Sequence, residues 1–377
     1  MKKKVDYLIQ GGHVIDGYRN ISEVKDLAIK DGKIVDSENV DPTYVIDATG
    51  CIVTPGLIDF HCHVAERVTE LGIPVESSCF PTGVTTAVDA GSTGVSNYEA
   101  FRTMSMNSRV RIKAFLNVCA AGLVTSAYHE NINPDYFRKE KILDFLNKYS
   151  DQLIGLKIRQ SAEIAGELGI KPMKRMLEIA EEAKCPVVVH TTNPPVSPEE
   201  IVEMLRPGDV YAHVYQGKGM TVVRDGNVIS ELPDAQKRGV IFDAANGGNH
   251  FGFKVAETCM KEGFLPDIIS TDLTVKTMYI PGKVFSLPFI MSKYLAMGMA
   301  LEEIVERVTT IPARVLGEEK ELGSLCEGTC ADIVIHKLID HPTVFQDFFG
   351  DERKGEKLFK TQMTFRAGMP VFRQIDF

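Results

Sequence analysis

The sequence lacks several features that would place the protein in a specialised class. No apolar run in its 377 residues approaches the roughly 20 residues that a membrane-spanning helix needs, so no membrane partner is expected. The apolar part of the N-terminal segment "MKKKVDYLIQGG" is too short for a signal peptide. Basic residues are not in excess, and the formal net charge of −9 argues against nucleic acid as the main partner, because phosphate binding favours a basic face.

The cysteines lack the spacing of a disulfide or zinc framework. None of the eight belongs to a CxxC pair, and Cys326 and Cys330 stand alone as a spaced pair. We therefore expect reduced thiols and a cytoplasmic location. A GxSxG motif is also absent, so nothing in the sequence indicates a serine nucleophile of that kind.

The central part of the chain alternates short apolar runs with stretches of helical periodicity, which predicts βα units and a parallel sheet. Helices are expected over residues 170–185, 197–206, 253–264 and 301–311, the second with Ser197 as N-cap and Glu200 three residues later. Eight strands with crossover helices predict an α/β fold of the (β/α)8 TIM-barrel type. The eight runs are "GLIDFHCHV", "GVTTAVDAG", "VRIKAFLNV", "LIGLKIRQ", "CPVVVHTT", "DVYAHVYQG", "GVIFDAANGG" and "DIISTDL".

Both ends of the chain have a different texture, with short β-rich segments separated by Gly and Asp-Gly turns. We expect residues 1–54 and 320–377 to combine into one small β-sandwich domain beside a barrel of residues 55–319. The segment "VVRDGNVIS" predicts a hairpin inserted after the sixth strand, with Asp225-Gly226 at its turn.

Polar side chains stand at the ends of five of the eight strands. In a barrel of this type the carboxyl ends of the strands form the catalytic face, and side chains two residues apart on a strand share a face. One such histidine is more often a hydrogen-bonded core or loop residue, and a lone aspartate there often caps a turn. The joint pattern favours a site for zinc or a similar divalent ion, because neutral imidazole and carboxylate are suitable ligands. The residues are His61, His63, Lys157, His190, His213 and Asp272.

The stretch "VTPGLIDFHCHV", followed by those strand-end residues and the closing "EGTCADIVI", resembles the amidohydrolase superfamily in its binuclear form. The resemblance covers essentially the whole chain and is greatest to bacterial members described as deacetylases, dihydroorotase-like or adenine-deaminase-like proteins. It implies that His61, His63 and Asp272 bind one metal and that His190 and His213 bind a second. It also implies that Lys157 carries a carbon dioxide-derived carbamate that bridges the two ions. Zinc is the divalent metal that we expect.

The resemblance implies an enzyme that hydrolyses an amide or ester through a hydroxide bridging the two metals, with Asp272 as the general acid and base. Physical chemistry supports the carbamate, because an ammonium would repel two cations whereas an anion with two oxygens can span them. Deacetylation of a small acylated acid is the leading expectation, and hydrolysis of a cyclic amide or deamination of adenine is the alternative. No arginine follows the second histidine as in the HxHxR of dihydroorotases, and the orientation of Arg67 is open.

Two further residues are candidates for binding the substrate. Arg159 lies two residues after Lys157 and should share its inward face, where a guanidinium can pair with a carboxylate. The equally weighted alternative is that Arg159 pairs with a barrel acid such as Asp89 or Asp243. His250, in the glycine-containing loop "AANGGNHFGF", is expected to contact the substrate, and residues 273–284 are expected to cover the site. A small molecule, possessing a carboxylate in this reading, is the expected partner, together with further copies of the chain in a homo-oligomer.

Overall fold

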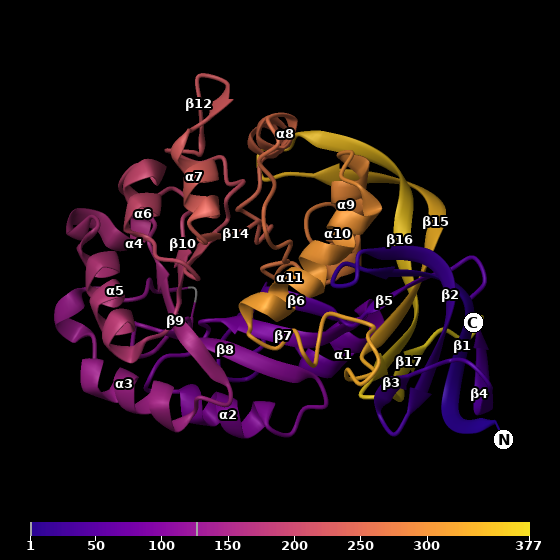
Figure 1. Ribbon diagram of the computed structural model, residues 1–377. Helices are drawn as coiled ribbons and strands as arrows, with labels where there is room; N and C mark the ends of the chain where they lie inside the picture. The colour runs from indigo at the N-terminus through magenta and orange to yellow at the C-terminus, as the bar shows by residue number, and fades with distance from the viewer. Residues whose placement is uncertain (1, 126) are drawn as a thin grey trace.

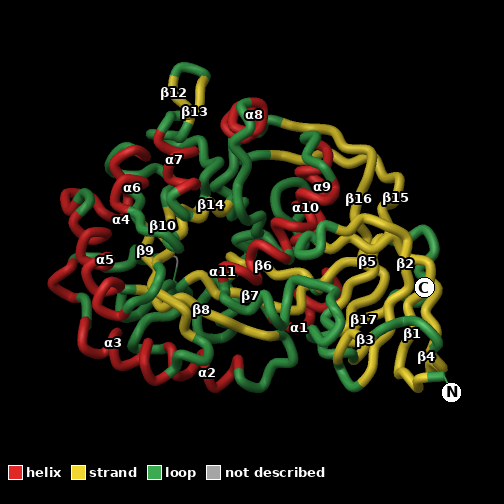
Figure 2. The backbone as a smooth tube through the Cα atoms, in the orientation of Figure 1, coloured by secondary structure: helices red, strands yellow, loops and turns green. Residues whose placement is uncertain are grey.

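Two large sheets organise the protein, which was analysed as a computed structural model that describes residues 2–125 and 127–377. Figure 1 shows a parallel barrel sheet surrounded by helices and, beside it, a second sheet next to which both termini lie. Figure 2 colours the chain by secondary structure and shows most of the long strands in the sheet next to the termini.

The barrel sheet contains seven parallel strands in the order β14-β11-β10-β9-β8-β7-β6. They correspond to the first seven of the eight predicted runs, and the residues of β6, β7, β10 and β11 are all buried. Complete burial is what strands with helices on one side and a packed barrel interior on the other require. The strands are β6 (Leu57–Cys62), β7 (Val84–Ala90), β8 (Arg111–Asn117), β9 (Leu153–Arg159), β10 (Val187–His190), β11 (Val210–Ala212) and β14 (Ile241–Asp243).

The eighth run closes the barrel without forming a continuous strand. Ile268 makes a parallel bridge to Asp243 on β14, and Leu273 makes one to Cys62 on β6. Between these bridges Asp272 has a φ of 51°, which lies outside the β region and interrupts the strand. The TIM-barrel prediction is therefore confirmed, and its eighth strand is replaced by an irregular segment.

The helices cover the outside of the barrel, as Figures 1 and 2 show. Helices α5, α6, α8 and α10 occupy the four predicted ranges, and the Ser197 hydroxyl accepts a hydrogen bond from the backbone N–H of Glu200 at the start of α6 (3.3 Å). The helices are α1 (Val75–Cys79), α2 (Tyr98–Ser105), α3 (Lys139–Lys148), α4 (Ala162–Ala165), α5 (Lys171–Ala183), α6 (Pro198–Met204), α7 (Glu231–Lys237), α8 (Phe253–Lys261), α9 (Leu287–Ala296), α10 (Leu301–Val308) and α11 (Thr310–Val315), with 3₁₀ turns at Phe80–Thr82, Pro134–Tyr136 and Gly166–Leu168. Among residues 2–125 and 127–377, no helix has both the length and the apolar character that crossing a membrane demands.

The two ends of the chain form one sheet in the order β17-β16-β15-β5-β1-β2-β3, with β4 also paired to β1. Its buried side chains, such as Ile9, Val53 and Phe365, share an apolar core. The segments predicted to be β-rich at both ends therefore combine as expected. The strands are β1 (Lys3–Asp16), β2 (Ile21–Lys30), β3 (Lys33–Val35), β4 (Val40–Asp47), β5 (Ile52–Pro55), β15 (Ile333–Gln346), β16 (Glu352–Arg366) and β17 (Met369–Arg373).

Two hairpins project from this framework. β12 (Val223–Arg224) and β13 (Asn227–Val228) form the predicted insertion, with positive φ values at both turn residues, Asp225 (52°) and Gly226 (80°). The longer hairpin, β15–β16, arches from the terminal sheet to α8 in Figure 1. At its tip the backbone N–H of Gln346 donates to the Gly282 carbonyl (2.8 Å) and that of Phe348 donates to the Phe251 carbonyl (3.1 Å). The terminal sheet thus contributes to the loops at the carboxyl ends of the barrel strands.

Candidate active site

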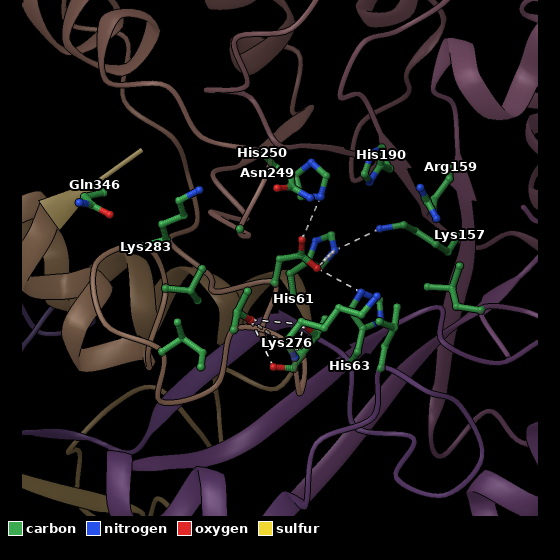
Figure 3. Close-up of a pocket in the computed structure, with 18 of the residues that line it drawn as sticks. His61, His63, Lys157, Arg159, His190, Asn249, His250, Lys276, Lys283 and Gln346 are labelled. Carbon is green, nitrogen blue, oxygen red and sulfur yellow. Dashed lines mark hydrogen bonds and ion pairs between the residues drawn. The ribbon is translucent and has the colours of Figure 1, made fainter. Parts of the chain in front are cut away.

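The six strand-end residues meet at one rim of the barrel (Figure 3 labels four of them). His61 Nε2 lies 3.2 Å from Lys157 Nζ, and His63 Nε2 lies 3.1 Å from Asp272 Oδ1. The rings of His190 and His213 have their centroids 4.3 Å apart, and those of His61 and His213 are 5.1 Å apart. All six side chains are buried. The structure therefore brings together every residue that the sequence placed at this rim.

Glycines make room for two of these side chains. Gly91 follows β7 with a φ of 80°, and a Cβ at that position would lie 2.5 Å from the Cβ of Lys157. Gly247, in the loop after β14, has a φ of 55°, and a Cβ there would lie 2.6 Å from Asp272 Oδ2 and 2.5 Å from His250 Cδ2. Only glycine suits these two backbone positions, so the loop glycine serves to seat Asp272 and His250.

The hydrogen bonds of the outer ring nitrogens determine where the inner nitrogens carry lone pairs. His213 Nδ1 lies 2.7 Å from the Ala245 carbonyl, which can only accept, so Nδ1 carries the proton. His61 Nδ1 lies 3.2 Å from the Asp243 carboxylate, which likewise accepts when ionised. The Nε2 atoms of both rings then present lone pairs to the barrel mouth, and His213 Nε2 is buried without any hydrogen-bond partner.

A similar chain of hydrogen bonds orients His63. The Ser92 hydroxyl donates to Asp89 Oδ2 (2.7 Å), and its oxygen lies 2.8 Å from His63 Nδ1. A hydroxyl has one proton, so His63 Nδ1 donates to Ser92. His63 Nε2 and Asp272 Oδ1 then face each other at 3.1 Å as two acceptors, and this arrangement requires a positive charge between them, either a proton or a metal ion.

The electrostatics of the cluster favour neutral nitrogen donors. Burial lowers the pKa of His61, His190 and His213 well below the ordinary value for histidine, and it lowers the pKa of Lys157 to about 8. Neutral imidazoles held by a carboxylate or carbonyl at the outer nitrogen are the usual arrangement around a metal. The histidines and the aspartate therefore fit a divalent ion of the zinc type. Lys157 fits one only when it is neutral or carboxylated, because its ammonium would repel a cation.

The backbone is strained at two of the expected ligands. His213 has a φ of 67° and Asp272 a φ of 51°, values in the left-handed region that non-glycine residues seldom adopt. Such conformations cost on the order of 1–3 kcal/mol each and concentrate at functional sites. The strain at His213 and Asp272 therefore indicates that these residues belong to a functional site, because it lowers the stability of the fold.

His250 lies closer to the cluster than the sequence indicated. Its ring centroid is 4.4 Å from that of His213 and 4.8 Å from that of His190, so these three histidines form one group of potential donors, and His61, His63 and Asp272 form another. His250 Nδ1 lies 2.8 Å from the Thr192 hydroxyl, and His250 Nε2 lies 3.5 Å from Asp272 Oδ2. It also lines the cavity, where the sequence placed it as a substrate contact.

Arg159 has a partner that the sequence did not indicate. Its Nη1 lies 3.1 Å from Oε2 of Glu130, whose side chain is only 4% exposed, while Arg159 itself lines the cavity. The alternative expectation, pairing with an acid, is met by Glu130 in place of Asp89 or Asp243. The carboxylates of Asp89 and Asp243 accept hydrogen bonds from Ser92 and from His61, Ser270 and Ala245, respectively. Arg159 therefore faces the site with one edge of its guanidinium already paired.

The cavity above the cluster has a volume of about 610 Å³, within the range usual for sites that bind small molecules. The segment after Asp272 forms much of its wall, as expected for residues 273–284, with Thr274, Lys276, Thr277, Ile280, Pro281, Lys283 and Val284. Tyr279 is tethered away from it, because its hydroxyl donates to the Ser77 carbonyl (2.9 Å). Arg67 is also turned away, with a side chain 88% exposed and paired to Glu66.

Several residues of the site were missed by sequence reasoning. Asp243, which orients His61, ends β14 and had a detectable signal in its strand-end position. Glu130 lies in the loop after β8, and Gln346 reaches the cavity from the distant hairpin. No periodicity in the sequence marks those two positions.

The barrel and its rim of histidines, lysine and aspartate define a TIM-barrel protein with donor groups suited to metal ions. Residues 52–368 match the model of the amidohydrolase family, and the chain belongs to that family. It is 37% identical over 321 residues to Deacetylase Atu3266 of Agrobacterium fabrum, an alignment that covers 84% of this chain and 78% of that protein.

Two solved structures share the whole architecture. A crystal structure described as a dihydroorotase has a TM-score of 0.88 and 33% sequence identity, and the match covers 98% of each chain. A crystal structure described as an adenine deaminase has the same TM-score with 25% identity, covering 98% of this chain and 100% of that one. The resemblance noted in the sequence is confirmed at the level of family and fold.

Proposed function

We propose that this amidohydrolase is a binuclear metal-dependent deacetylase that cleaves the amide or ester bond of a small acylated acid. One observation carries the proposal: oriented histidines turn the lone pairs of their Nε2 atoms toward the place where buried Asp272 and buried Lys157 meet. His61, His63 and Asp272 would hold one ion, His190 and His213 the other, and Lys157, carboxylated on its amine, both. Zinc is the proposed metal, because nitrogen donors predominate.

Divalent ions held there would supply a water of lowered pKa and a Lewis acid for the substrate carbonyl. Asp272 would accept a proton from the attacking water and deliver it to the leaving nitrogen or oxygen as the acyl bond breaks. Burial alone would raise the pKa of Asp272, but its contact with the His63 ring lowers that pKa below the ordinary value, so the base is ionised near neutral pH. His250, 3.5 Å from Asp272 Oδ2, would contact the substrate and steady the carboxylate.

The substrate class rests on two supports. Arg159 offers the cavity a guanidinium edge suited to a carboxylate, and Deacetylase Atu3266 is named for the removal of an acetyl group. The cyclic-amide alternative is weakened, because Arg67, the arginine nearest the second histidine along the chain, is directed to solvent.

A panel of N-acetyl amino acids of both hands, with dihydroorotate and adenine, tests the reaction. We expect acetate release from at least one N-acetyl acid. Turnover of dihydroorotate or adenine alone would contradict deacetylation and support the alternative.

Metal analysis of protein purified without chelators tests the binuclear centre. We expect about two equivalents per chain, an added carboxylate on Lys157 by native mass analysis, and loss of metal in Lys157→Ala. Full metal content and full activity in Lys157→Ala, without any added short carboxylic acid, would exclude the bridging role.

A further inference from the structure

Lys283 is one of several cationic residues that line the cavity, and it lies at a distance from Arg159. Figure 3 shows Lys283 and Arg159 on opposite sides of His61 and His250. Arg159 is paired with Glu130, whereas within residues 2–125 and 127–377 no carboxylate forms an ion pair with the Lys283 ammonium. The aromatic ring nearest to that ammonium is Phe348, with its centroid 5.6 Å away.

The backbone that carries Lys283 is held from two sides. The Lys283 carbonyl accepts a hydrogen bond from Nζ of Lys293 (2.7 Å), and the preceding carbonyl, of Gly282, accepts one from the backbone N–H of Gln346 (2.8 Å). Lys293 is 1% exposed and lies 4.5 Å from the ring centroid of Phe251. Lys283 therefore extends from a fixed support, and the Gln346 side chain lines the cavity beside it.

The charge of Lys283 is not offset by its surroundings. A cation–π contact at a partly exposed site contributes only about 0.5–1 kcal/mol and leaves the charge in place. Lys218 lies 4.0 Å from the centroid of the same Phe348 ring, so a second cation shares that ring with Lys283. The Glu352 carboxylate lies nearby and accepts an N–H from the Gln346 amide (2.9 Å), but among the described residues it forms no ion pair with Lys283. An anion beside the Lys283 ammonium would therefore gain a charged hydrogen bond.

We propose that Lys283, together with Gln346, binds a second acidic group of the substrate, so that the preferred substrates are acylated dicarboxylic acids. This inference rests on the proposed deacetylation, with Arg159 binding the carboxylate nearer the scissile bond. The volume of about 610 Å³ supports it, because an acetyl group and a single carboxylate would leave much of that space unfilled. Lys283 at the far wall then selects the end of the substrate. Gln346 donates one amide N–H to Glu352 (2.9 Å) and offers the other to the same group.

The sharpest test compares N-acetylglutamate with N-acetylglutamine, which have nearly the same shape and differ in the terminal charge. We expect the wild type to favour the glutamate derivative, of whichever hand it accepts, and Lys283→Met to lose roughly 10- to 100-fold in kcat/KM on it, mainly through KM. Lys283→Met should keep its kcat/KM on the glutamine derivative. Lys254→Met is the control, because Lys254 is 85% exposed and lies outside the cavity.

Equal losses on both derivatives, or a wild-type preference for the glutamine derivative, would overturn the inference. Isothermal titration calorimetry measures the affinity for glutarate, which has two carboxylates, and for butyrate, which has one. This measurement does not depend on turnover. Tighter binding of glutarate that disappears in Lys283→Met supports the second anion site even if neither acetyl compound is cleaved, a result that would contradict only the deacetylation. Glutarate binding that is unchanged in Lys283→Met would refute the site.

Discussion

At the residue scale, each oriented histidine has one ring nitrogen committed to the protein, and that bond determines what the other nitrogen can do. Ala245, Asp243 and Ser92 serve His213, His61 and His63 in this way. Outer partners of this kind set the tautomer and the ring orientation, and their loss typically weakens metal binding or activity. The site thus has two layers. The inner layer consists of the histidines that face the cavity, and the outer layer consists of the groups that hydrogen-bond to them.

Replacing Asp272 by asparagine tests its role in proton transfer. The amide keeps the shape of the side chain but cannot accept the proton, so we expect kcat to fall by about 10²- to 10⁴-fold. Steady-state kinetics on the accepted acetyl substrate give the measurement, and the melting temperature and metal content of the variant provide controls. Unchanged turnover would remove Asp272 from the proposed mechanism.

Arg159→Met tests whether Arg159 binds the substrate carboxylate. A charged hydrogen bond is worth about 1.5–3 kcal/mol, so we expect a loss of roughly 10- to 150-fold in kcat/KM on acylated acids and little loss on neutral aryl acetates. Glu130→Gln is the matched control, because it removes the charge of the partner of Arg159 while keeping the arginine. A loss of equal size on both substrate classes would instead indicate that Arg159 only supports the barrel wall.

The histidines, the lysine and the aspartate at the rim were predictable from sequence, whereas parts of the cavity wall were not. His61 and His63 could be placed on one face because strand side chains alternate, and the other polar residues could be placed at a rim because parallel strands end together. Glu130 lies in a loop without periodicity, and Gln346 reaches the cavity from a distant hairpin. Their approach to the cavity depends on tertiary packing that no local pattern encodes.

At the element scale, the eighth strand and the long hairpin show where pattern and structure separate. The run "DIISTDL" has strand composition, yet the positive φ of Asp272 interrupts it, because the side chain must turn into the site. The terminal segments predicted a small β-sandwich domain, but not that β15 and β16 extend to the loops after the barrel strands. The hairpin tip is positioned by contacts with Gly282 and Phe251, which lie far from it in sequence.

Lys293, on α9, gives a prediction about stability and pH. Burial lowers its pKa to about 7, whereas an unfolded chain has the ordinary lysine value near 10.4. Between these values the unfolded state binds more protons, so this residue makes the free energy of unfolding rise with pH. We expect the wild type to gain stability relative to Lys293→Met between about pH 7 and about pH 9.5.

Urea unfolding of both proteins at the two pH values measures this difference. Lys357→Met is the control, since Lys357 is partly exposed on β16 and its pairing with Asp340 lies on the surface. If the stabilities of the wild type and Lys293→Met change in parallel with pH, Lys293 is not buried in its neutral form.

At the scale of the whole molecule, the buried carboxylate of Asp332 links the two sheets. We propose that residues 1–54 with 320–377 and residues 55–319 are the two structural units, and Asp332 lies where they meet. Its oxygens contact Arg111 on barrel strand β8 (3.0 Å) and Arg366 on β16 of the terminal sheet (3.1 Å), and its backbone carbonyl accepts from the N–H of Gly56 (2.7 Å). The hairpin tip that supports the cavity belongs to the same sheet, so this junction connects the two units on which the site depends.

Asp332→Ala should therefore destabilise the whole protein without changing the chemistry of the site. The Asp332 side chain is 5% exposed, and removing one partner of a buried ion pair costs on the order of 3–5 kcal/mol. Both arginines are about one-fifth exposed, so water screens them and we expect the lower end of that range, about 3 kcal/mol. Asp340→Ala is the control, because Asp340 is 86% exposed on the neighbouring strand, and surface pairs contribute about 0–1 kcal/mol.

Calorimetry should show one cooperative transition, lowered by several degrees in Asp332→Ala and scarcely in Asp340→Ala, while kcat at a temperature well below either transition stays unchanged. Equal shifts in the two variants would show that the junction does not depend on Asp332, and two separate transitions in the wild type would show that the barrel and the terminal sheet unfold independently.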